Sequence, residues 1–368
     1  MQYDVIGREQ LMGTCQDFCP AKERRERKQQ RRLHVLELGP PKTNQTSELA
    51  EDTGRKYMIK EYSRPAAGKD STRKSDLRPP VVLLQVVEYM ISELVIRRDL
   101  PWYKIYQFVF DRLRAVRQDL VIQQASCQES VTILEHAVRF HIYAGHRLCE
   151  ESISNFEPKF NTDHTQECLK RLLVEYRENG VRSENHIEFE ALYILSNLGS
   201  FEVILNALSL PASIRKHPSM HLALAISNCF LHGNFVRLGR LASKCSYLQS
   251  CAIHQYLPVI RCEAMSALNA AYSGRNLKFP AELLAKWLLF DSTVDAVEFC
   301  EQSGLEATID GIRFQRGSLK LEWKQWPNKR SYQLVERKLP QEFSISAIIR
   351  GSASQADYVE RSKRMPKR

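Results

Sequence analysis

The sequence predicts an all-α protein, and three observations support this fold class. From Val81 to Ser303, apolar residues recur with the 3.6-residue period of a helix. Glycine and proline are nearly absent from the interiors of these periodic segments, where both would weaken a helix. The connections between the segments are short, so successive helices should be antiparallel neighbours. No strict sequence period accompanies this pattern, which predicts a degenerate helical solenoid at most.

Composition limits the class of protein and its compartment. Of the 368 residues, 43% are hydrophobic and 26% are charged, which excludes wholesale disorder. No apolar run reaches the roughly 18 residues that suggest a membrane span, and the N-terminus lacks the pattern of a secretory signal. The ten cysteines are scattered like small hydrophobic residues, which indicates a reducing compartment. The net charge of +10 favours an acidic partner, either nucleic acid or an acidic protein surface.

Residues 1–80 are expected to form a basic helix and an extended region. Within 21–32, seven basic residues stand against two acidic ones. The stretch is compatible with a helix laid on RNA, with a nuclear localisation signal or with a solvated charged helix. Arg24, Arg25 and Arg27 are therefore candidates for contact with a partner or with nucleic acid.

A charged stretch in the helix predicted for residues 101–124 is the main candidate for a structural motif. Arg112 and Asp119 border its apolar stripe on one edge, and Arg117 borders it on the other. Charges that are half-buried need partners. We expect these three side chains to brace the helices against a loop at 62–69; a solvated helix with ordinary local ion pairs is the alternative. The candidate motif residues are Arg64, Asp111, Arg112, Arg117 and Asp119.

Most of the remaining chain is predicted to be helical. The predicted helices cover residues 81–98, 101–124, 128–151, 163–178, 184–198, 200–208, 218–231, 234–243, 249–272, 280–289 and 293–303. A turn around Gly233 joins two amphipathic helices, as in a helical hairpin.

No arrangement of residues predicts an active site. His136, His141 and His146 share one helix but point in different directions, so they cannot bind one metal ion. Cys15 and Cys19 do not have the spacing of a zinc site. The sequence also has no Ser/His/Asp or Cys/His constellation and no glycine-rich phosphate loop. We therefore expect no catalytic, cofactor or metal site, and no enzyme.

Residues 277–320 predict two helices followed by a β-hairpin, which is the layout of a winged helix. The hairpin strands are expected at 305–309 and 312–315, with Asp310-Gly311 in a type I′ turn. The second helix carries acidic residues and neither lysine nor arginine, so it would repel phosphates in a major groove. The candidate contacts to a partner protein or nucleic acid are Arg313, Arg316, Lys320 and Lys324.

Several stretches resemble the Sac-three/GANP family. They are Gly13–Arg24 (GTCQDFCPAKER), Lys60–Lys69 (KEYSRPAAGK), Leu77–Pro80 (LRPP), Phe108–Asp119 (FVFDRLRAVRQD) and Arg139–Ile142 (RFHI). They occur in the order typical of the family, and the resemblance runs from about Gly13 to Phe314. Phe18 and Ala21 depart from it mildly, because the family tends to have methionine and glutamate there.

The resemblance implies a right-handed helical superhelix of the PCI/TPR-like type, capped by a small winged helix. Family members are scaffolds and not enzymes. They pair with another PCI-domain protein and with a small acidic subunit of the Sem/DSS type, and they hold RNA on a basic surface. The chain would then divide into a basic N-terminal region (1–80), a PCI-like helical-repeat domain (81–276), a winged helix (277–320) and a basic, disordered tail (321–368).

The resemblance leaves two roles open. The chain has little beyond the family domain and is similar in length to the short animal members, which implies a scaffold acting in centrosome duplication and spindle assembly during mitosis. The alternative is a nuclear adaptor that couples transcription to mRNA export. We expect the protein in the nucleus and cytoplasm, with the centrosome and spindle as further sites.

Overall fold

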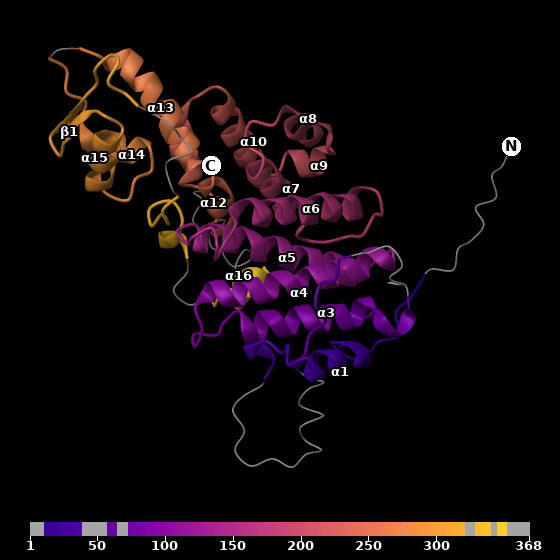
Figure 1. Ribbon diagram of the computed structural model, residues 1–368. Coiled ribbons are helices and arrows are strands. Elements are labelled where there is room, and N and C mark those ends of the chain that lie inside the picture. Colours follow the sequence, from indigo (N-terminus) through magenta and orange to yellow (C-terminus); the bar gives the residue numbers. More distant parts are fainter. Residues whose placement is uncertain are drawn as a thin grey trace. The chain divides into compact units, whose positions relative to one another are not determined.

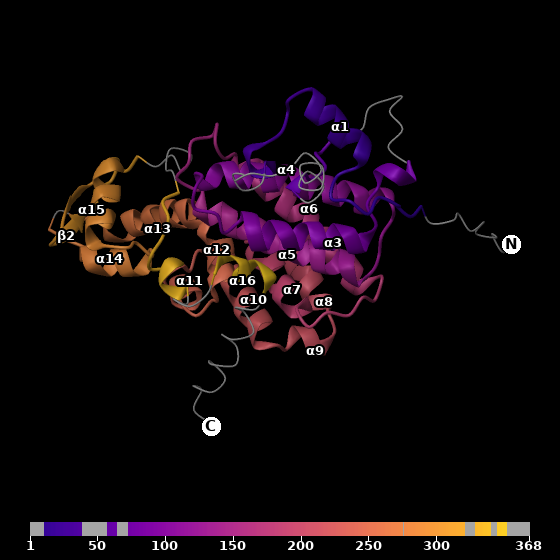
Figure 2. The same ribbon diagram turned by 90° about the horizontal axis from the view of Figure 1, so that it is seen from below.

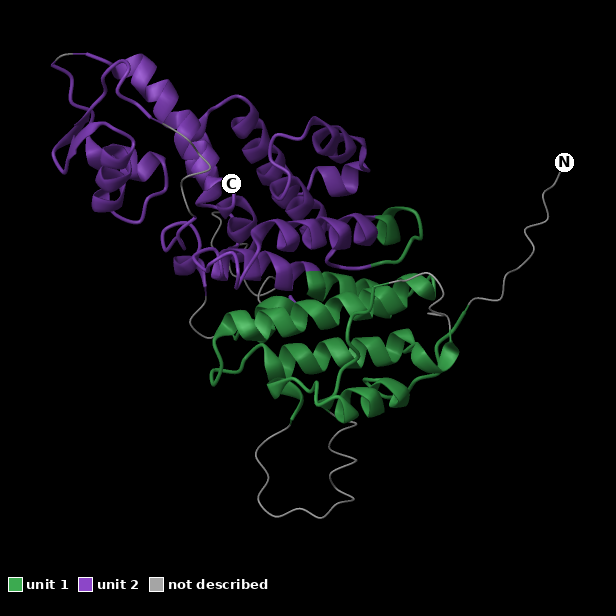
Figure 3. Cartoon of the chain, in the orientation of Figure 1, with its two compact units in different colours: residues 1–137, 174–182, 344–350 green, residues 138–173, 183–343, 351–368 purple. Residues whose placement is uncertain are grey.

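The computed structural model describes residues 11–38, 57–64, 73–274, 276–320, 328–339 and 344–351. The regular secondary structure of these residues is almost entirely helical, with one two-stranded sheet, so the all-α prediction is confirmed (Figure 1). The chain forms two compact units, coloured separately in Figure 3. Unit 1 comprises residues 1–137, 174–182 and 344–350, and unit 2 comprises 138–173, 183–343 and 351–368. The four segments expected from the sequence are a different division and stay a prediction.

Unit 1 is built around the long helix α4. Prolines stand immediately before or at the first residue of its helices, as at Pro20, Pro80 and Pro101, because proline is pre-shaped for a helix start and needs no amide partner there. The elements are α1 (Ala21–Gln29), the 3₁₀ turns η1 (Val35–Glu37) and η2 (Lys74–Asp76), α3 (Pro80–Tyr89) with its π-helical extension η3 (Met90–Leu94), α4 (Trp102–Ile122), the first half of α5 (Gln128–Arg147), the end of α6 (Pro158–Arg177), and α16 (Ile345–Arg350).

Unit 2 holds the rest of α5 and α6 and a series of shorter helices. They are α7 (His186–Leu195), α8 (Phe201–Ser209), α9 (Ala212–Arg215), α10 (Pro218–Leu231), α11 (Phe235–Ala242), α12 (Tyr247–His254), α13 (Leu257–Tyr272), α14 (Ala281–Trp287) and α15 (Thr293–Gln302), followed by strands β1 (Glu306–Thr308) and β2 (Gly311–Arg313) and the 3₁₀ turn η5 (Glu336–Lys338). Helix α7 packs against α8, α10 and α12. The turn between α10 and α11 is where the sequence predicts it, with Gly233 at a φ of 62°.

The helix predicted for residues 249–272 is wrong as a single element. The chain forms α12 and α13 instead, separated by a turn at Gln255 and Tyr256. Pro258 lies in the first turn of α13, where its missing amide proton costs nothing, whereas inside one long helix it would break a hydrogen bond. Ser246 and Gln249 form a capping box that starts α12.

Two helices and a hairpin follow α13 in the predicted order and share one core, which includes Phe279, Phe299 and Ile312. Both Figure 1 and Figure 2 show α14, α15 and the strands gathered together. The predicted type I′ turn is wrong, because Ile309 and Asp310 are the corner residues and neither has the positive φ that this turn requires. Gly311 instead pairs with Thr308, and a side chain there would press on the Phe279 carbonyl.

The expectation of a disordered tail after residue 320 is wrong for the two segments of it that the structure describes. Leu334 and Val335 are buried in unit 2, and Ile348 and Ile349 of α16 are buried in unit 1. Because these two apolar pairs stand among basic and polar residues, the sequence pattern did not predict that they are buried. Residues 321–327 and 352–368 lie outside the described part of the chain.

Candidate functional site

Charged side chains meet in the interior of unit 1, where α1, η1 and residues 57–64 approach α4. Figure 1 shows α1, α3 and α4 as neighbouring helices. Arg27, Arg78 and Asp119 are fully buried, and Glu37 and Arg112 are nearly so. Burying ionised groups is costly unless they are paired and hydrogen-bonded. Each of these buried charges therefore has to pair with other groups. Together, these charged residues and their partners are called the buried charge network.

Glu37 is the first centre of this buried charge network. Its carboxylate accepts hydrogen bonds from Arg27 of α1 and from Arg112 of α4, whose Nη2 lies 3.2 Å from Glu37 Oε1. The backbone amides of His34 and Ile59 donate to the same carboxylate, each at 3.1 Å. One side chain thus joins α1, α4, η1 and the 57–64 segment.

Arg27 points inward because it shares the inner face of α1 with Arg24, three residues earlier. Its Nη1 donates to the Ile59 carbonyl at 3.0 Å, and its Nε lies 3.1 Å from Glu61 Oε1. Burial opposes the charge of Arg27, but the carboxylates of Glu37 and, to a lesser extent, Glu61 together raise the pKa of the guanidinium. Arg27 therefore stays ionised inside unit 1.

Asp119 is the second centre of the buried charge network. The Lys60 ammonium donates to Asp119 Oδ1 at 2.7 Å, and Arg78 Nε donates to Oδ2 at 2.8 Å. Lys60 also donates to the Asp76 carbonyl, and Arg78 donates to the Phe18 carbonyl. Asp119 thus joins α4 to three segments that precede it in the chain.

The segment that follows Lys60 lies along α4. The Tyr62 amide donates to Asp111 Oδ2 at 3.2 Å, and Gln118 donates to the Ser63 carbonyl at 2.9 Å. The guanidinium of Arg114 stacks on the Tyr62 ring at 3.8 Å from its centroid. These contacts hold residues 62 and 63, whereas residues 65–69 of the predicted loop lie outside the described part of the chain.

The network is suited to fixing backbone segments. Each buried carboxylate meets two cations, and several of the cations also bind backbone carbonyls. Removing one partner would leave an uncompensated buried charge, which typically costs about 3–5 kcal/mol.

The residues predicted for the structural motif have different positions in the structure. Arg112 and Asp119 belong to the two centres, and Asp111 binds both Arg112 and the Tyr62 amide. Arg117 is half-buried on α4, and Arg64 is exposed. The motif prediction therefore identified the two residues of α4, Arg112 and Asp119, that belong to the buried charge network.

The residues predicted to contact a partner or nucleic acid divide in the same way. The prediction is wrong for Arg24 and Arg27, because both are buried. Arg24 donates to Asp17 at 2.7 Å and to the Cys19 carbonyl at 2.6 Å. Arg25 is exposed on the outer face of α1.

The hairpin residues of the same prediction are exposed in unit 2. These are Arg313, Arg316 and Lys320, and Arg313 forms a cross-strand pair with Glu306 at 3.3 Å. Lys324 lies outside the described part of the chain.

Sequence reasoning missed the partners of Arg112 and Asp119. Lys60 and Arg78 stand inside two of the family-like stretches, beside Tyr62 and Pro79, but nothing local indicates that they meet Asp119. Nothing in the local sequence predicts Glu37 as a partner, because it lies in a single 3₁₀ turn without a periodic apolar pattern around it.

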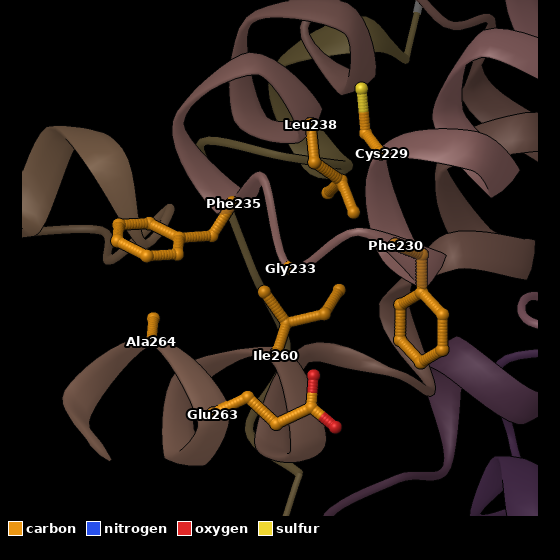
Figure 4. A pocket seen from close by; sticks show the side chains of 8 residues that line it. All are labelled: Cys229, Phe230, Gly233, Phe235, Leu238, Ile260, Glu263 and Ala264. Atoms are coloured by element: carbon orange, nitrogen blue, oxygen red, sulfur yellow. The ribbon is translucent and has the colours of Figure 1, made fainter. Parts of the chain in front are cut away.

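Elsewhere the described residues offer a small pocket and no metal site. The pocket lies in unit 2 between the end of α10, the start of α11 and α13 (Figure 4). Its lining is apolar except for the carboxylate of Glu263. Among the residues that the structure describes, no group of three or more His, Cys, Asp or Glu side chains is placed to hold a metal ion. In the same part of the chain, no helix has both the length and the apolar character needed to cross a membrane.

Comparison with known proteins identifies the family of this sequence. A sequence model of the SAC3/GANP family matches residues 18–309. SAC3 family protein 1 of Schizosaccharomyces pombe is 29% identical over 383 residues, which cover 95% of this chain and 36% of that protein. SAC3 family protein B of Arabidopsis thaliana is 29% identical over 76% of this chain and 17% of its own length. Protein xmas of Drosophila melanogaster is 27% identical over 92% of this chain and 16% of its own length. The chain thus spans about a third or less of these relatives.

Proposed function

Because this chain belongs to the SAC3/GANP family, we propose that it is a non-catalytic helical scaffold that holds other proteins together. The observation that carries the proposal is the buried charge network. Its ionised groups are engaged by one another and by backbone groups, and four segments of unit 1 are fixed by them. A rigid helical body of this kind suits the presentation of fixed surfaces to partners.

At the level of fold, we propose a PCI/TPR-like right-handed superhelix capped by a winged helix. Consecutive short helices joined by tight turns support the first part, and the α14, α15, β1 and β2 order supports the second. The exposed side of α15 carries Glu298 and Glu301. An acidic helix is repelled by the phosphates of a major groove, so this cap is better suited to docking a protein than to reading DNA.

The proposed partners follow from the family. They are a PCI-domain protein and a small acidic subunit of the Sem/DSS type, with RNA as a further ligand. Exposed cations favour the last: Arg25 on α1, and Arg313, Arg316 and Lys320 around the hairpin. The phosphate backbone is the main determinant of non-specific affinity for RNA.

The scaffold has two proposed roles. One is in centrosome duplication and spindle assembly during mitosis, as the resemblance implies. The other is that of a nuclear adaptor coupling transcription to mRNA export, which the exposed cations favour. We propose the nucleus and cytoplasm as its locations, with the centrosome and spindle in the first role.

Affinity purification of the full chain from dividing cells, with and without nuclease, separates these roles. Recovery of a PCI-domain protein with a small acidic subunit, and with RNA in the untreated half, supports the export adaptor. Recovery of centrosomal or spindle proteins that resist nuclease supports the mitotic role. Purification of the chain with no stoichiometric protein partner in either half would overturn the scaffold proposal.

Charge reversal tests the contribution of the hairpin to RNA binding. For single-stranded RNA, the logarithm of affinity falls with the logarithm of salt concentration by about 0.7 per phosphate contact. Arg313→Glu with Arg316→Glu should therefore weaken binding and make this slope shallower by about 1.4. Arg237→Glu with Arg240→Glu, an equally exposed pair on α11, is the matched control. An equal loss in both variants would remove the hairpin as a distinct contact site.

A further inference from the structure

Helix α8 of unit 2 has two apolar faces, and one of them is open to solvent. Val203 and Ala207 are buried on the inner face. On the other side, Phe201 is 70% exposed, Leu205 is 65% exposed and Leu208 is 47% exposed. These three residues follow one another at spacings of four and three, so they form one continuous stripe along the helix.

The exposed stripe is unusual for a short surface helix. A helix with one buried face normally carries polar residues on the opposite side, and a helix that is apolar all round is normally covered. Single exposed hydrophobic residues need no explanation, whereas adjacent ones on a single face indicate a contact surface. Ser200 caps the helix, with its hydroxyl accepting from the Val203 amide, so the stripe is held in a helical form.

Polar groups surround the stripe unevenly. Glu202, Asn206 and Ser209 lie along one flank and are exposed. Two cations stand at the C-terminal end of α8, where Figures 1 and 2 both show α9 beside it. Arg215 Nη1 donates to the Leu208 carbonyl at 2.8 Å, and Lys216 follows it at the surface. The Leu208 end of the stripe therefore lies beside the positively charged Arg215.

We propose that this outer face of α8 docks an amphipathic helix of a partner protein. The partner helix places its own apolar residues, three and four apart, on Phe201, Leu205 and Leu208. Its acidic residues lie against Arg215, with the exposed Lys216 next to it in sequence, which sets its direction along α8. A helix is the partner form that matches a straight apolar stripe of this length with charge at one end. The inference concerns α8 and α9 alone and does not depend on RNA binding.

The test uses the full chain and a designed fluorescent peptide. The peptide has roughly 18 residues, or about five helical turns, with leucines on one face and glutamates in one terminal turn; a second peptide has lysines in place of the glutamates. Fluorescence anisotropy should show binding of the glutamate peptide. Phe201→Ser with Leu205→Ser should weaken it by about tenfold or more. Ile153→Ser, at a residue that is 75% exposed elsewhere in unit 2, is the control and should leave binding unchanged.

A charge swap tests the direction of docking. Arg215→Glu with Lys216→Glu should weaken the glutamate peptide and strengthen the lysine peptide. Thermal unfolding should be unchanged in the serine variants and at most slightly lowered in the charge swap, because the altered side chains are exposed and only Arg215 loses a hydrogen bond, to the Leu208 carbonyl. Equal affinity of both peptides for the wild-type chain, or no loss with the serine variant, overturns the proposal. Sedimentation velocity gives a further check: a dimer of the free chain that the serine variant dissolves would assign the stripe to a second copy and overturn the partner helix.

Discussion

At the scale of residues, the main feature is that Glu37 and Asp119 each pair with two cations of unit 1. Arg27, Arg112 and Arg78 are buried, and Lys60 is partly buried. The pairs join residues far apart in sequence, 75 positions for Glu37 and Arg112 and 41 for Arg78 and Asp119. A pair of this kind is weak evidence for high stability, since its formation also removes both charges from water. Breaking such a pair is different, because the surviving partner keeps its position in unit 1 without its counter-charge.

Substitution of Asp119 should therefore lower the stability of the folded chain. Asp119→Asn keeps the shape of the side chain but leaves Lys60 and Arg78 without their counter-charge. We expect the free energy of unfolding to fall by about 3–5 kcal/mol. Arg112→Ala should act in the same direction, because Glu37 loses one of its two cations. Urea unfolding followed by circular dichroism measures both effects. Asp99→Asn, in the exposed pair with Arg97, is the control and should leave the curve unchanged. Wild-type stability in both variants would show that the network does not brace unit 1.

A second residue-scale feature is a pair of neutral histidines in unit 2. His146 and His254 are buried with their rings edge to face, 4.7 Å between centroids. His254 donates from Nε2 to the Lys329 carbonyl at 2.8 Å. Burial lowers the pKa of His146 to about 3, and the nearby Arg330 adds to this effect. Burial also lowers the pKa of His254 to about 4, although its hydrogen bond to the Lys329 carbonyl opposes the shift.

These pKa values predict how stability changes with acid. Both histidines bind a proton more readily in the unfolded chain, where their pKa is about 6.5. The stability of the folded chain is thus unaffected by them above that value, and it falls as the pH drops from about 6.5 towards 4, by up to about 1.4 kcal/mol per pH unit for each ring. His254→Gln, which keeps a donor for Lys329, should make the dependence shallower in urea unfolding across this range. His221→Gln, at an exposed position, should not. An unaltered pH dependence in His254→Gln would contradict the pKa argument.

At the scale of elements, the segment 328–339 is attached to unit 2 by Asp291. The carboxylate of this residue accepts from the Ser331 hydroxyl at 3.0 Å and from the Tyr332 and Gln333 amides at 2.7 and 2.8 Å. Lys338 then donates to the Ala242 carbonyl at 2.7 Å. The Asp291 carboxylate thus binds the beginning of this segment, and Leu334 and Val335 are buried further along it.

Asp291→Ala should loosen this segment and leave the helices of unit 2 folded. The two amides lose their acceptor, so their hydrogen exchange should become faster by about tenfold or more, which corresponds to at least about 1.4 kcal/mol of local stability. Hydrogen exchange with mass spectrometry measures it over residues 328–339. Glu150→Gln removes an exposed pair with Arg330 and should have a smaller effect on the same peptides. Equal protection in Asp291→Ala and the wild type would show that Asp291 does not hold this segment in place.

At the scale of the whole molecule, residues beyond 320 supply core to both units. Leu334 and Val335 belong to unit 2, and Ile348 and Ile349 to unit 1. Complete burial of an aliphatic side chain typically contributes about 1.5–3 kcal/mol. Helix α16 also places Arg350 2.8 Å from Glu88 within unit 1.

Truncation after Lys320 should therefore destabilise the chain and expose apolar surface. A lower unfolding temperature and binding of a hydrophobic dye are the expected results, with scanning calorimetry and dye fluorescence as the measurements. Truncation after Gly351, which keeps every contact described here, is the comparison. Identical unfolding of both truncated chains would restore the view of residues 328–351 as a dispensable tail.

The sequence alone determined the helical class of the protein, the position of most helices, and the need of Arg112 and Asp119 for partners. These properties are local, because a helix repeats every 3.6 residues and a charge beside an apolar stripe is visible within a few turns. Only the tertiary structure decided that Glu37, Lys60 and Arg78 are those partners, that Arg24 and Arg27 of a basic helix turn inward, and that segments 328–339 and 344–351 carry buried residues. Each of these depends on contacts between segments distant in the chain, and a local pattern does not carry the identity of a distant partner.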